Sequence, residues 1–495
     1  MPYADFHIHG SFKAYFTGNE VKDKKSPWDY IAYKVDKILF RRYNEIFSSQ
    51  SCFSQMLKGN VGLAVVPLYS VEHGFVGSTL LKILNLLSKN IDNKLFRKII
   101  RREVTHYQQL LECLEHLKTA AAGNSPEHQL VNFTRTFADI KEGHINVIYS
   151  LEGAHAFLDR DEDAALPEAL NRAMERVKAF KKRDPQAPFP RLFILNFTHL
   201  TRAPFGNHAF GIKMLNHEDF IPKGRGISVA GWKLIETALT SDQDHYPILL
   251  DVKHMSLECR KSYYTYRRQW FPNVPIVASH AGCTGISYNK VNDYILEINT
   301  PHLNKKTCNL VSYQKPDGHL PGTGFNPWSI NLYDEDIVEI LTSGGIIGLS
   351  LDQRILGTGK VAREKMSRDE TFVGITPLRP VLGADPDEDP SIRDAELHLR
   401  QLCNNLFHII KVGRRIEGFG DDAWKQVVIG SDFDGLIDAV DLCPTAEHYS
   451  LIRVQLLQKL PALADEARIE LPAPLHEMVE GIMYENGYAF LKKWY

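Results

Sequence analysis

Eight short apolar runs, separated by segments with helical periodicity, constrain the fold of this chain more than any other feature. Nearly continuous apolar runs of this length are typical of parallel strands that are covered on both faces. Eight such strands alternating with helices predict an α/β fold, a (β/α)8 TIM barrel. The predicted strands are residues 4–9, 61–68, 145–152, 192–199, 247–254, 275–280, 345–351 and 427–432.

The remaining segments predict helices and long connections around this barrel. A barrel with insertions can hold all of residues 1–495 as one domain, although the length alone would permit two or three. The predicted outer helices are residues 166–181, 230–240, 257–268, 335–342 and 393–411. Helical insertions are expected at about 10–58 and 70–143, with amphipathic helix over 80–87 and 95–117, and long loops at about 283–334 and 353–392.

Composition and charge narrow the classes of partner. The formal net charge is −2, so no global field would attract nucleic acid or an anionic membrane. No apolar run approaches the roughly 18 residues needed to span a bilayer. Seven dispersed cysteines without a CxxC pair favour a reducing compartment. We therefore expect a cytoplasmic protein that acts on a small molecule, with no nucleic-acid or membrane partner, and a homodimer is left open.

Residues able to bind metal or move a proton stand at the ends of six of the eight predicted strands. Active sites of such barrels lie at the carboxyl ends of the strands, so we expect these side chains to meet. Each residue alone has an ordinary structural explanation, but their joint placement is specific. They are His7, His9, Glu152, His199, His254, His280 and Asp432.

Imidazole and carboxylate ligands without thiolate suit zinc, manganese, iron or cobalt at a catalytic site with an open position. Four histidines and one carboxylate are too many for a single open site. Glu152 has two carboxylate oxygens, and one could face each of two ions. The sequence therefore predicts a binuclear centre of two divalent metal ions, with zinc preferred, that makes hydroxide available near neutral pH.

Six motifs occur in order between residue 5 and residue 435. They are Asp5-Phe-His-Ile-His9, Ser150-Leu-Glu-Gly-Ala-His155, Phe197-Thr-His199, Leu250-Asp-Val-Lys-His-Met-Ser256, Ala278-Ser-His280 and Gly430-Ser-Asp-Phe-Asp-Gly435. With these motifs the chain resembles the amidohydrolase superfamily, and within it the renal (membrane) dipeptidase family. The resemblance does not extend to the insertions.

The resemblance implies a role for each matching position. His7 and His9 would bind the first metal ion, and His254 and His280 the second, with Glu152 bridging the two. In the same family pattern, the aspartate would take a proton from the attacking water and deliver it to the leaving amine. The histidine after the fourth strand would donate a hydrogen bond to the developing oxyanion. These last two positions are Asp432 and His199.

Two departures from the family pattern concern charge and specificity. The family usually has His-x-Asp at the first strand, whereas this chain has His7-Ile-His9. The family also places an arginine for the substrate carboxylate shortly after the sixth-strand histidine, but residues 281–295 contain only one cation, Lys290. Lysine is a poor replacement for a bidentate guanidinium. Arg354 and Arg202, after the seventh and fourth strands, are the alternative candidates for binding a substrate anion.

Two further residues, His155 and Asp434, lie just beyond the main motifs and could orient them. The favoured hypothesis is a metal-dependent hydrolase of an amide bond in a dipeptide or a related small N-acyl compound. The alternative keeps the barrel and the metals but hydrolyses an ester, lactone or phosphoester. A non-catalytic scaffold is a third possibility, although a decayed site should have lost a ligand or the aspartate.

Overall fold

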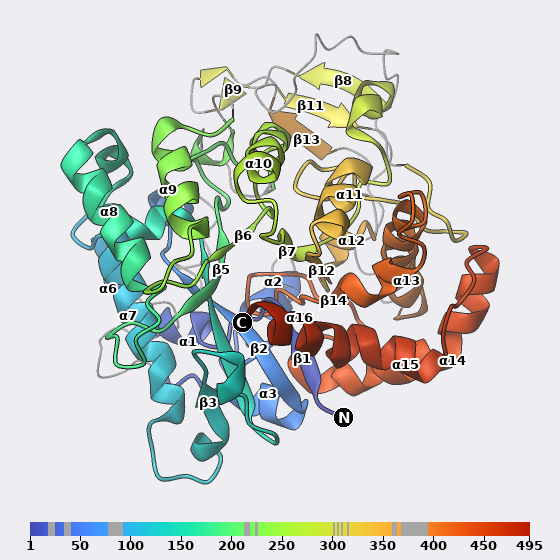
Figure 1. The fold of residues 1–495 in the computed structure, drawn as a ribbon, viewed down its shortest axis with the longest axis horizontal. Helices are drawn as coiled ribbons and strands as arrows, with labels where there is room; N and C mark the ends of the chain where they lie inside the picture. The colour runs from blue at the N-terminus through green and yellow to red at the C-terminus, as the bar shows by residue number, and fades with distance from the viewer. Residues whose placement is uncertain are drawn as a thin grey trace.

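The computed structural model describes residues 1–17, 25–33, 41–77, 93–211, 218–222, 226–299, 302–303, 306–307, 310–313, 316–358, 364–367 and 395–495. All eight predicted strands are present, and they pair in parallel, in chain order, around one sheet (Figure 1). The (β/α)8 prediction is therefore confirmed. The strands are β1 (Tyr3–Asp5), β2 (Val61–Tyr69), β4 (Ile145–Glu152), β5 (Leu192–Asn196), β6 (Leu249–Asp251), β7 (Val277–Ala281), β12 (Ile346–Leu349) and β14 (Val427–Ile429).

The last strand returns beside the first, because main-chain hydrogen bonds join their two segments. Phe6 N donates to Ile429 O at 2.9 Å, and Asp432 N donates to His7 O at 2.9 Å. The fully buried Asp5 carboxylate strengthens this seam, since it accepts hydrogen bonds from the main-chain nitrogens of His7 (3.0 Å) and Ser431 (2.9 Å). The first motif is thereby held against the last, although 426 residues separate Asp5 from Ser431.

The predicted outer helices are also present and surround the sheet in Figure 1. They are α8 (Pro167–Ala179), α9 (Val229–Leu239), α10 (Leu257–Trp270), α11 (Asp334–Thr342) and α13 (Ala395–Gly413). Their apolar faces belong to one large buried cluster that runs from Tyr3 to Met483. The chain continues through α14 (Tyr449–Glu466), α15 (Leu475–Glu480) and α16 (Asn486–Trp494).

The amino-terminal end of the barrel is closed by α16. Phe490 and Leu491 of this helix share a buried cluster with the strand residues Ala4 and Val428 and with Phe6, which follows β1 directly. Gly487 permits this contact, since a Cβ there would lie 2.6 Å from a ring atom of Phe6. One end of the barrel is thus filled by apolar side chains, and the opposite end is left for the polar strand termini.

The helical insertions are present, with two differences from the prediction. Their helices are α1 (Phe12–Tyr15), α2 (Arg41–Phe47), α3 (Phe53–Lys58), α4 (His73–Gly77), α6 (Asn93–Ile100) and α7 (His106–Lys118). The prediction of one helix over 95–117 was wrong, because Arg102 has a φ of 58° and Thr105 caps a new helix by accepting from Gln108 N at 3.1 Å. A short unpredicted strand, β3 (Val131–Phe133), pairs with β4. The helix expected over 80–87 lies outside the described residues.

The stretches expected to be long loops contain some regular structure. Three strands far apart in the sequence form a small antiparallel sheet, drawn at the top of Figure 1. They are β8 (Ile295–Asn299), β11 (Leu310–Tyr313) and β13 (Glu364–Ser367), and β9 (His302–Leu303) pairs with β10 (Lys306–Thr307). Pairing supplies the main-chain hydrogen bonds that a long irregular segment would lack. A short helix, α12 (Gln353–Leu356), follows β12 directly.

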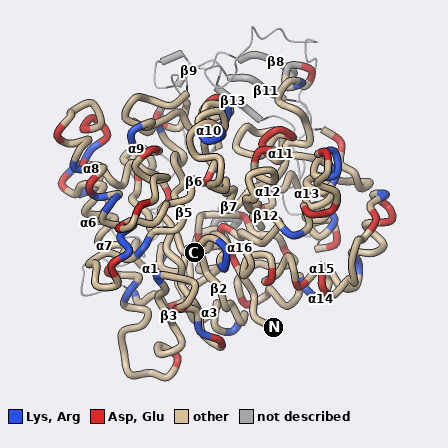
Figure 2. Tube along the Cα trace, in the orientation of Figure 1, with Lys and Arg blue, Asp and Glu red and all other residues tan. Residues whose placement is uncertain are grey.

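Acidic and basic residues are interspersed along the outer helices. Figure 2 shows both blue and red segments on α8, α10 and α13. This mixture agrees with the small net charge of the sequence. Among the described helices, none combines the length and the apolar character needed to cross a membrane.

Candidate metal centre

The polar residues that end the strands meet at the carboxyl end of the barrel, as predicted. Several strands end earlier than expected, so most of these side chains stand on the first residues of the following loops. At His254 and Asp432 the backbone leaves the extended conformation, because both residues have a φ of 65°. A non-glycine residue in this left-handed region ends a strand and costs about 1 kcal/mol or more, and such residues gather at functional sites.

The first donor group joins the two histidines after β1 to the carboxylate at the end of β4. The Nε2 atoms of His7 and His9 lie 3.3 Å apart. His7 Nε2 lies 3.4 Å from Glu152 Oε1, and His9 Nε2 lies 3.4 Å from Glu152 Oε2. All three side chains are buried. Three side chains, from the ends of two strands, therefore lie close enough together to share one metal ion.

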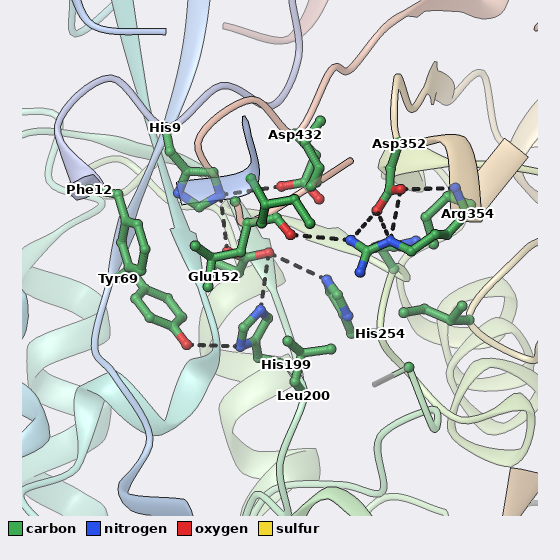
Figure 3. Close-up of a pocket in the computed structure, with 18 of the residues that line it drawn as sticks. His9, Phe12, Tyr69, Glu152, His199, Leu200, His254, Asp352, Arg354 and Asp432 are labelled. Atoms are coloured by element: carbon green, nitrogen blue, oxygen red, sulfur yellow. Dashed lines mark hydrogen bonds and ion pairs between the residues drawn. The ribbon is translucent and has the colours of Figure 1, made fainter. Parts of the chain in front are cut away.

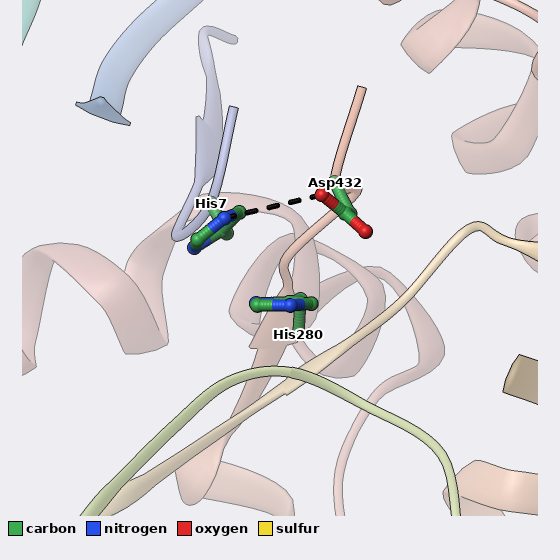
Figure 4. Close-up of side chains that lie close together, drawn as sticks. All are labelled: His7, His280 and Asp432. Atoms are coloured by element: carbon green, nitrogen blue, oxygen red, sulfur yellow. Dashed lines mark ion pairs between the residues drawn. The ribbon is translucent and has the colours of Figure 1, made fainter. Parts of the chain in front are cut away.

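The second donor group contacts Oε1 of the same carboxylate, the oxygen that also faces His7. His254 Nε2 and His280 Nε2 lie 3.1 Å apart, and they lie 3.4 Å and 3.8 Å from Glu152 Oε1. His280 also faces His7 and Asp432, and the three side chains point toward one another in Figure 4. Glu152 is thus common to both groups.

Ligands that bind one tetrahedral zinc ion at 2.0–2.1 Å lie about 3.3 Å from one another. The separations in the first donor group match that value, and those in the second lie near it. Two imidazole nitrogens cannot both direct hydrogens at each other at this distance. The donor set therefore fits the coordination of a divalent metal ion.

The charge states of the donors agree with this fit. Burial lowers the pKa of His254 to about 3 and that of His280 well below its usual range. Both imidazoles are therefore neutral at pH 7, which is the form that binds a cation. Burial alone would raise the pKa of Glu152, but His199 and the other imidazoles around it hold that pKa well below the usual range, so the carboxylate is ionised.

Outer contacts hold several of these rings in place. Ser279 Oγ lies 3.0 Å from His7 Nδ1 and 2.9 Å from His280 Nδ1, so one hydroxyl orients a ring of each donor group. Buried Asp251 accepts a hydrogen bond from Lys253 N at 2.9 Å and thereby shapes the turn that presents His254. Such partners fix ring orientation and raise ligand basicity.

His199 lies beside the donor groups and is held by residues that the sequence analysis missed. Its Nδ1 lies 2.6 Å from Glu72 Oε1 and 3.2 Å from Tyr69 OH, and its Nε2 lies 3.6 Å from Glu152 Oε1. Burial alone would lower the pKa of His199, but the Glu72 and Glu152 carboxylates outweigh burial and raise it to about 9. The ring therefore carries two N–H groups at neutral pH, and one is available to an incoming oxygen.

Asp432 borders both donor groups and lines the pocket that opens from them. Its Oδ1 lies 3.5 Å from His9 Nε2 and 3.9 Å from His7 Nε2, and its side chain is 15% exposed. Gly435 makes room for it, since a Cβ at that position would lie 2.0 Å from Asp432 Oδ1. The Gly-Ser-Asp-Phe-Asp-Gly motif therefore places one carboxylate at the boundary between the metal-binding atoms and the pocket.

Of the three cations expected to bind a substrate anion, the structure brings only Arg354 to this pocket. Its guanidinium is occupied by Asp352, with Nη2 2.6 Å from Oδ2 and Nε 3.0 Å from Oδ1 (Figure 3). Arg202 lines a separate surface pocket, where its Nε donates to Ile221 O at 3.2 Å. Lys290 is exposed and is absent from the described lining.

A fourth cation, Lys253, lines the pocket and was missed. Its side chain is 1% exposed, and no described residue accepts a hydrogen bond from its Nζ. Asp432 and Asp352 are among the carboxylates whose charges act on it. Its position directly before His254, in Leu250-Asp-Val-Lys-His254, could have identified Lys253 as a residue of the site. The sequence analysis considered only the histidine at this strand end. A buried ammonium without a partner is costly unless an anion joins it.

The residues expected to orient the site act at its edges. His155 Nε2 lies 2.9 Å from Ser70 O and links the loops after β4 and β2. Asp434 accepts a hydrogen bond from Gln50 N at 2.6 Å and pairs with Lys13 Nζ at 2.9 Å. Asp434 therefore fastens the first insertion to the loop after β14.

Comparison with known proteins identifies the fold. No family model and no curated protein matches the sequence. The crystal structure of the dipeptidase AC, a metallopeptidase of family M19, matches with a TM-score of 0.50 and 15% identity, covering 100% of this chain and 98% of that chain. This chain has the fold of an M19 dipeptidase. The probable dipeptidase PvdM from Pseudomonas aeruginosa matches with a TM-score of 0.50 and 12% identity over 99% of this chain and 94% of that one. The expected resemblance to renal dipeptidases is confirmed for the fold.

Proposed function

We propose that this protein is a metal-dependent hydrolase that cleaves an amide bond in a dipeptide or a small N-acyl amino acid. The observation that carries the proposal is the convergence of four imidazoles on the two oxygens of Glu152. His7 and His9 would hold one divalent cation and His254 and His280 the other. Two bound cations, with zinc preferred for this donor set, would lower the pKa of a water molecule and polarise the scissile carbonyl.

The chain's own residues would manage the protons and the developing charge. Asp432 would accept a proton from the attacking water and return it to the leaving amine, since its carboxylate faces both the donor groups and the pocket. His199 would donate a hydrogen bond to the oxygen that gains negative charge, with Glu72 holding the ring in position.

Metal analysis combined with a substrate panel tests this proposal. We expect the purified protein to contain close to two divalent ions per chain and to hydrolyse dipeptides or N-acyl amino acids faster than lactones and aryl phosphates. A chelator should abolish the activity, and zinc or manganese should restore it. A protein that folds stably without metal and hydrolyses none of these compounds would contradict the proposal, and a preference for lactones or phosphates would favour the alternative reaction.

Lys253 would bind the carboxylate of the substrate in place of the missing family arginine. Its ammonium lines the pocket without a hydrogen-bond partner among the described residues, whereas the guanidinium of Arg354 is already paired with Asp352. A hydrogen bond to a charged group contributes about 1.5–3 kcal/mol. Lys253→Met should therefore lower kcat/KM for a carboxylate substrate by roughly 10- to 100-fold, through KM.

The corresponding substrate amide, which lacks the charge, should lose much less activity in the same variant. Lys290→Met is the matched control, because Lys290 is exposed and lies outside the described pocket lining. Equal losses for the charged and uncharged substrates in Lys253→Met would show that Lys253 has a structural role instead.

A further inference from the structure

We propose that a second, apolar cavity beside the metal centre binds the acyl chain of an N-acyl amino acid, which deepens the proposed amide hydrolase function and rests on it. We call this cavity the annex. The residues that line it outside the main pocket include Phe16, Ile31, Tyr33, Val71 and Phe96. Water would add to the acyl carbon as the C–N bond breaks, releasing a fatty acid and a free amino acid.

The annex adjoins the pocket that opens from the metal centre. Four side chains line both spaces, so the two cavities share a wall. These side chains are Phe12, Phe47, Phe75 and Leu436. Phe12 also packs on the candidate ligand His9, with ring centroids 5.6 Å apart. A chain that leaves the reaction centre past Phe12 is therefore directed toward the annex.

The pocket is apolar on one side of the metal centre and charged on the other. Figure 3 shows Phe12 and Tyr69 on one side of Glu152, with Asp352 and Arg354 on the opposite side. Asp432 stands nearer the charged side in this view. A substrate with its amide at the centre would thus direct its carboxylate toward the charged side and its acyl group toward Phe12.

The polar groups that border the annex are already occupied within the protein. Lys13 Nζ donates to Ser48 O at 2.5 Å and pairs with Asp434 Oδ1 at 2.9 Å. Thr17 Oγ1 donates to Lys13 O at 2.7 Å. The remaining described walls are aromatic or aliphatic, except for the Tyr33 hydroxyl. Such a lining favours a hydrocarbon chain over a peptide, whose amide groups would need partners.

The annex is built by the insertions and not by the barrel strands alone. Its walls belong to a separate buried cluster that includes Phe16, Tyr33, Phe75 and Phe96. Phe16, Phe75 and Phe96 come from the segments around α1, α4 and α6, and Tyr33 comes from the stretch 25–33 between α1 and α2. The sequence motifs of the dipeptidase resemblance do not cover these segments. Residues of the insertions therefore form much of the lining of the annex.

A series of N-acylglycines with acetyl, butyryl, hexanoyl and octanoyl chains tests the inference on the metal-loaded, full-length protein. Each buried methylene should increase kcat/KM by about threefold, so octanoylglycine should exceed acetylglycine by at least about 100-fold. Calorimetry with the same compounds and the Asp432→Asn variant gives a second readout, because affinity should rise with chain length without turnover.

Variants that fill the annex give the matched comparison. Val71→Trp and the half-buried Thr17→Phe should each bring the octanoyl-to-acetyl ratio back toward one, and two positions guard against one variant failing to fold. Val454→Trp, on the exposed face of α14, should leave the ratio unchanged.

The outcomes separate this inference from the proposed function. A flat or falling dependence on chain length in both readouts overturns the annex, even if acetylglycine is hydrolysed. Failure to hydrolyse any N-acylglycine or dipeptide overturns the amide hydrolase, and the calorimetric dependence on chain length then decides whether the annex binds hydrocarbon.

Discussion

Asp432→Asn is expected to retain both metal ions and to lower kcat by roughly 10²- to 10⁴-fold, the usual contribution of a general acid–base group. Asparagine has nearly the same shape but cannot accept a proton from water. The left-handed backbone at residue 432 favours asparagine as well as aspartate, so the turn should be preserved. The measurement is kcat on the best substrate of the panel together with the metal content of the same preparation.

Metal content distinguishes the two roles that the geometry allows Asp432. Its Oδ1 lies within 3.5 Å of His9 Nε2 and could also contribute to metal binding. Loss of an ion together with activity would assign Asp432 as a ligand, and unchanged kcat would remove it from the mechanism. Asp465→Asn, on the exposed face of α14, is the control and should match the unaltered protein in both measurements.

The barrel could be predicted from sequence because its strands are buried on both faces. Such strands need mostly apolar residues, and the run 145–152 shows this, since five of its eight residues are apolar and all eight are buried in β4. The outer helices could be predicted for a similar reason, since each presents one apolar stripe to the sheet. The insertions were harder, because the break between α6 and α7 depends on the cap at Thr105 and not on hydrophobic periodicity.

The ligand positions were predictable because parallel strands bring their carboxyl ends together, whatever lies between them in the chain. The residues that surround these ligands, such as Glu72 and Lys253, could not be predicted in this way. Glu72 follows a strand whose predicted end was Leu68, so nothing marked it as the partner of His199. Whether a cation can bind a substrate anion depends on its neighbours in space. Arg354 is already paired with Asp352, whereas Lys253 is buried without a described hydrogen-bond partner.

Glu152→Gln is expected to have the largest effect of any single substitution. The carboxylate faces His7, His9, His254 and His280 through its two oxygens, at 3.4 to 3.8 Å. Glutamine keeps the shape but removes the negative charge and turns one acceptor into a donor. Even partners that only contact a ligand contribute 10- to 100-fold to metal affinity, so loss of the shared ligand should exceed about 100-fold.

The consequence should appear in metal content, stability and turnover together. Ions that bind only the folded protein stabilise it, so added zinc should raise the Tm of the unaltered protein but not that of Glu152→Gln. Turnover should fall further than in Asp432→Asn, because both donor groups lose a member. Glu168→Gln, exposed in the first turn of α8, should behave as the unaltered protein does. If Glu152→Gln still bound two ions with unchanged affinity, the four imidazoles would not share this carboxylate, and the binuclear proposal would fail while the barrel fold remained.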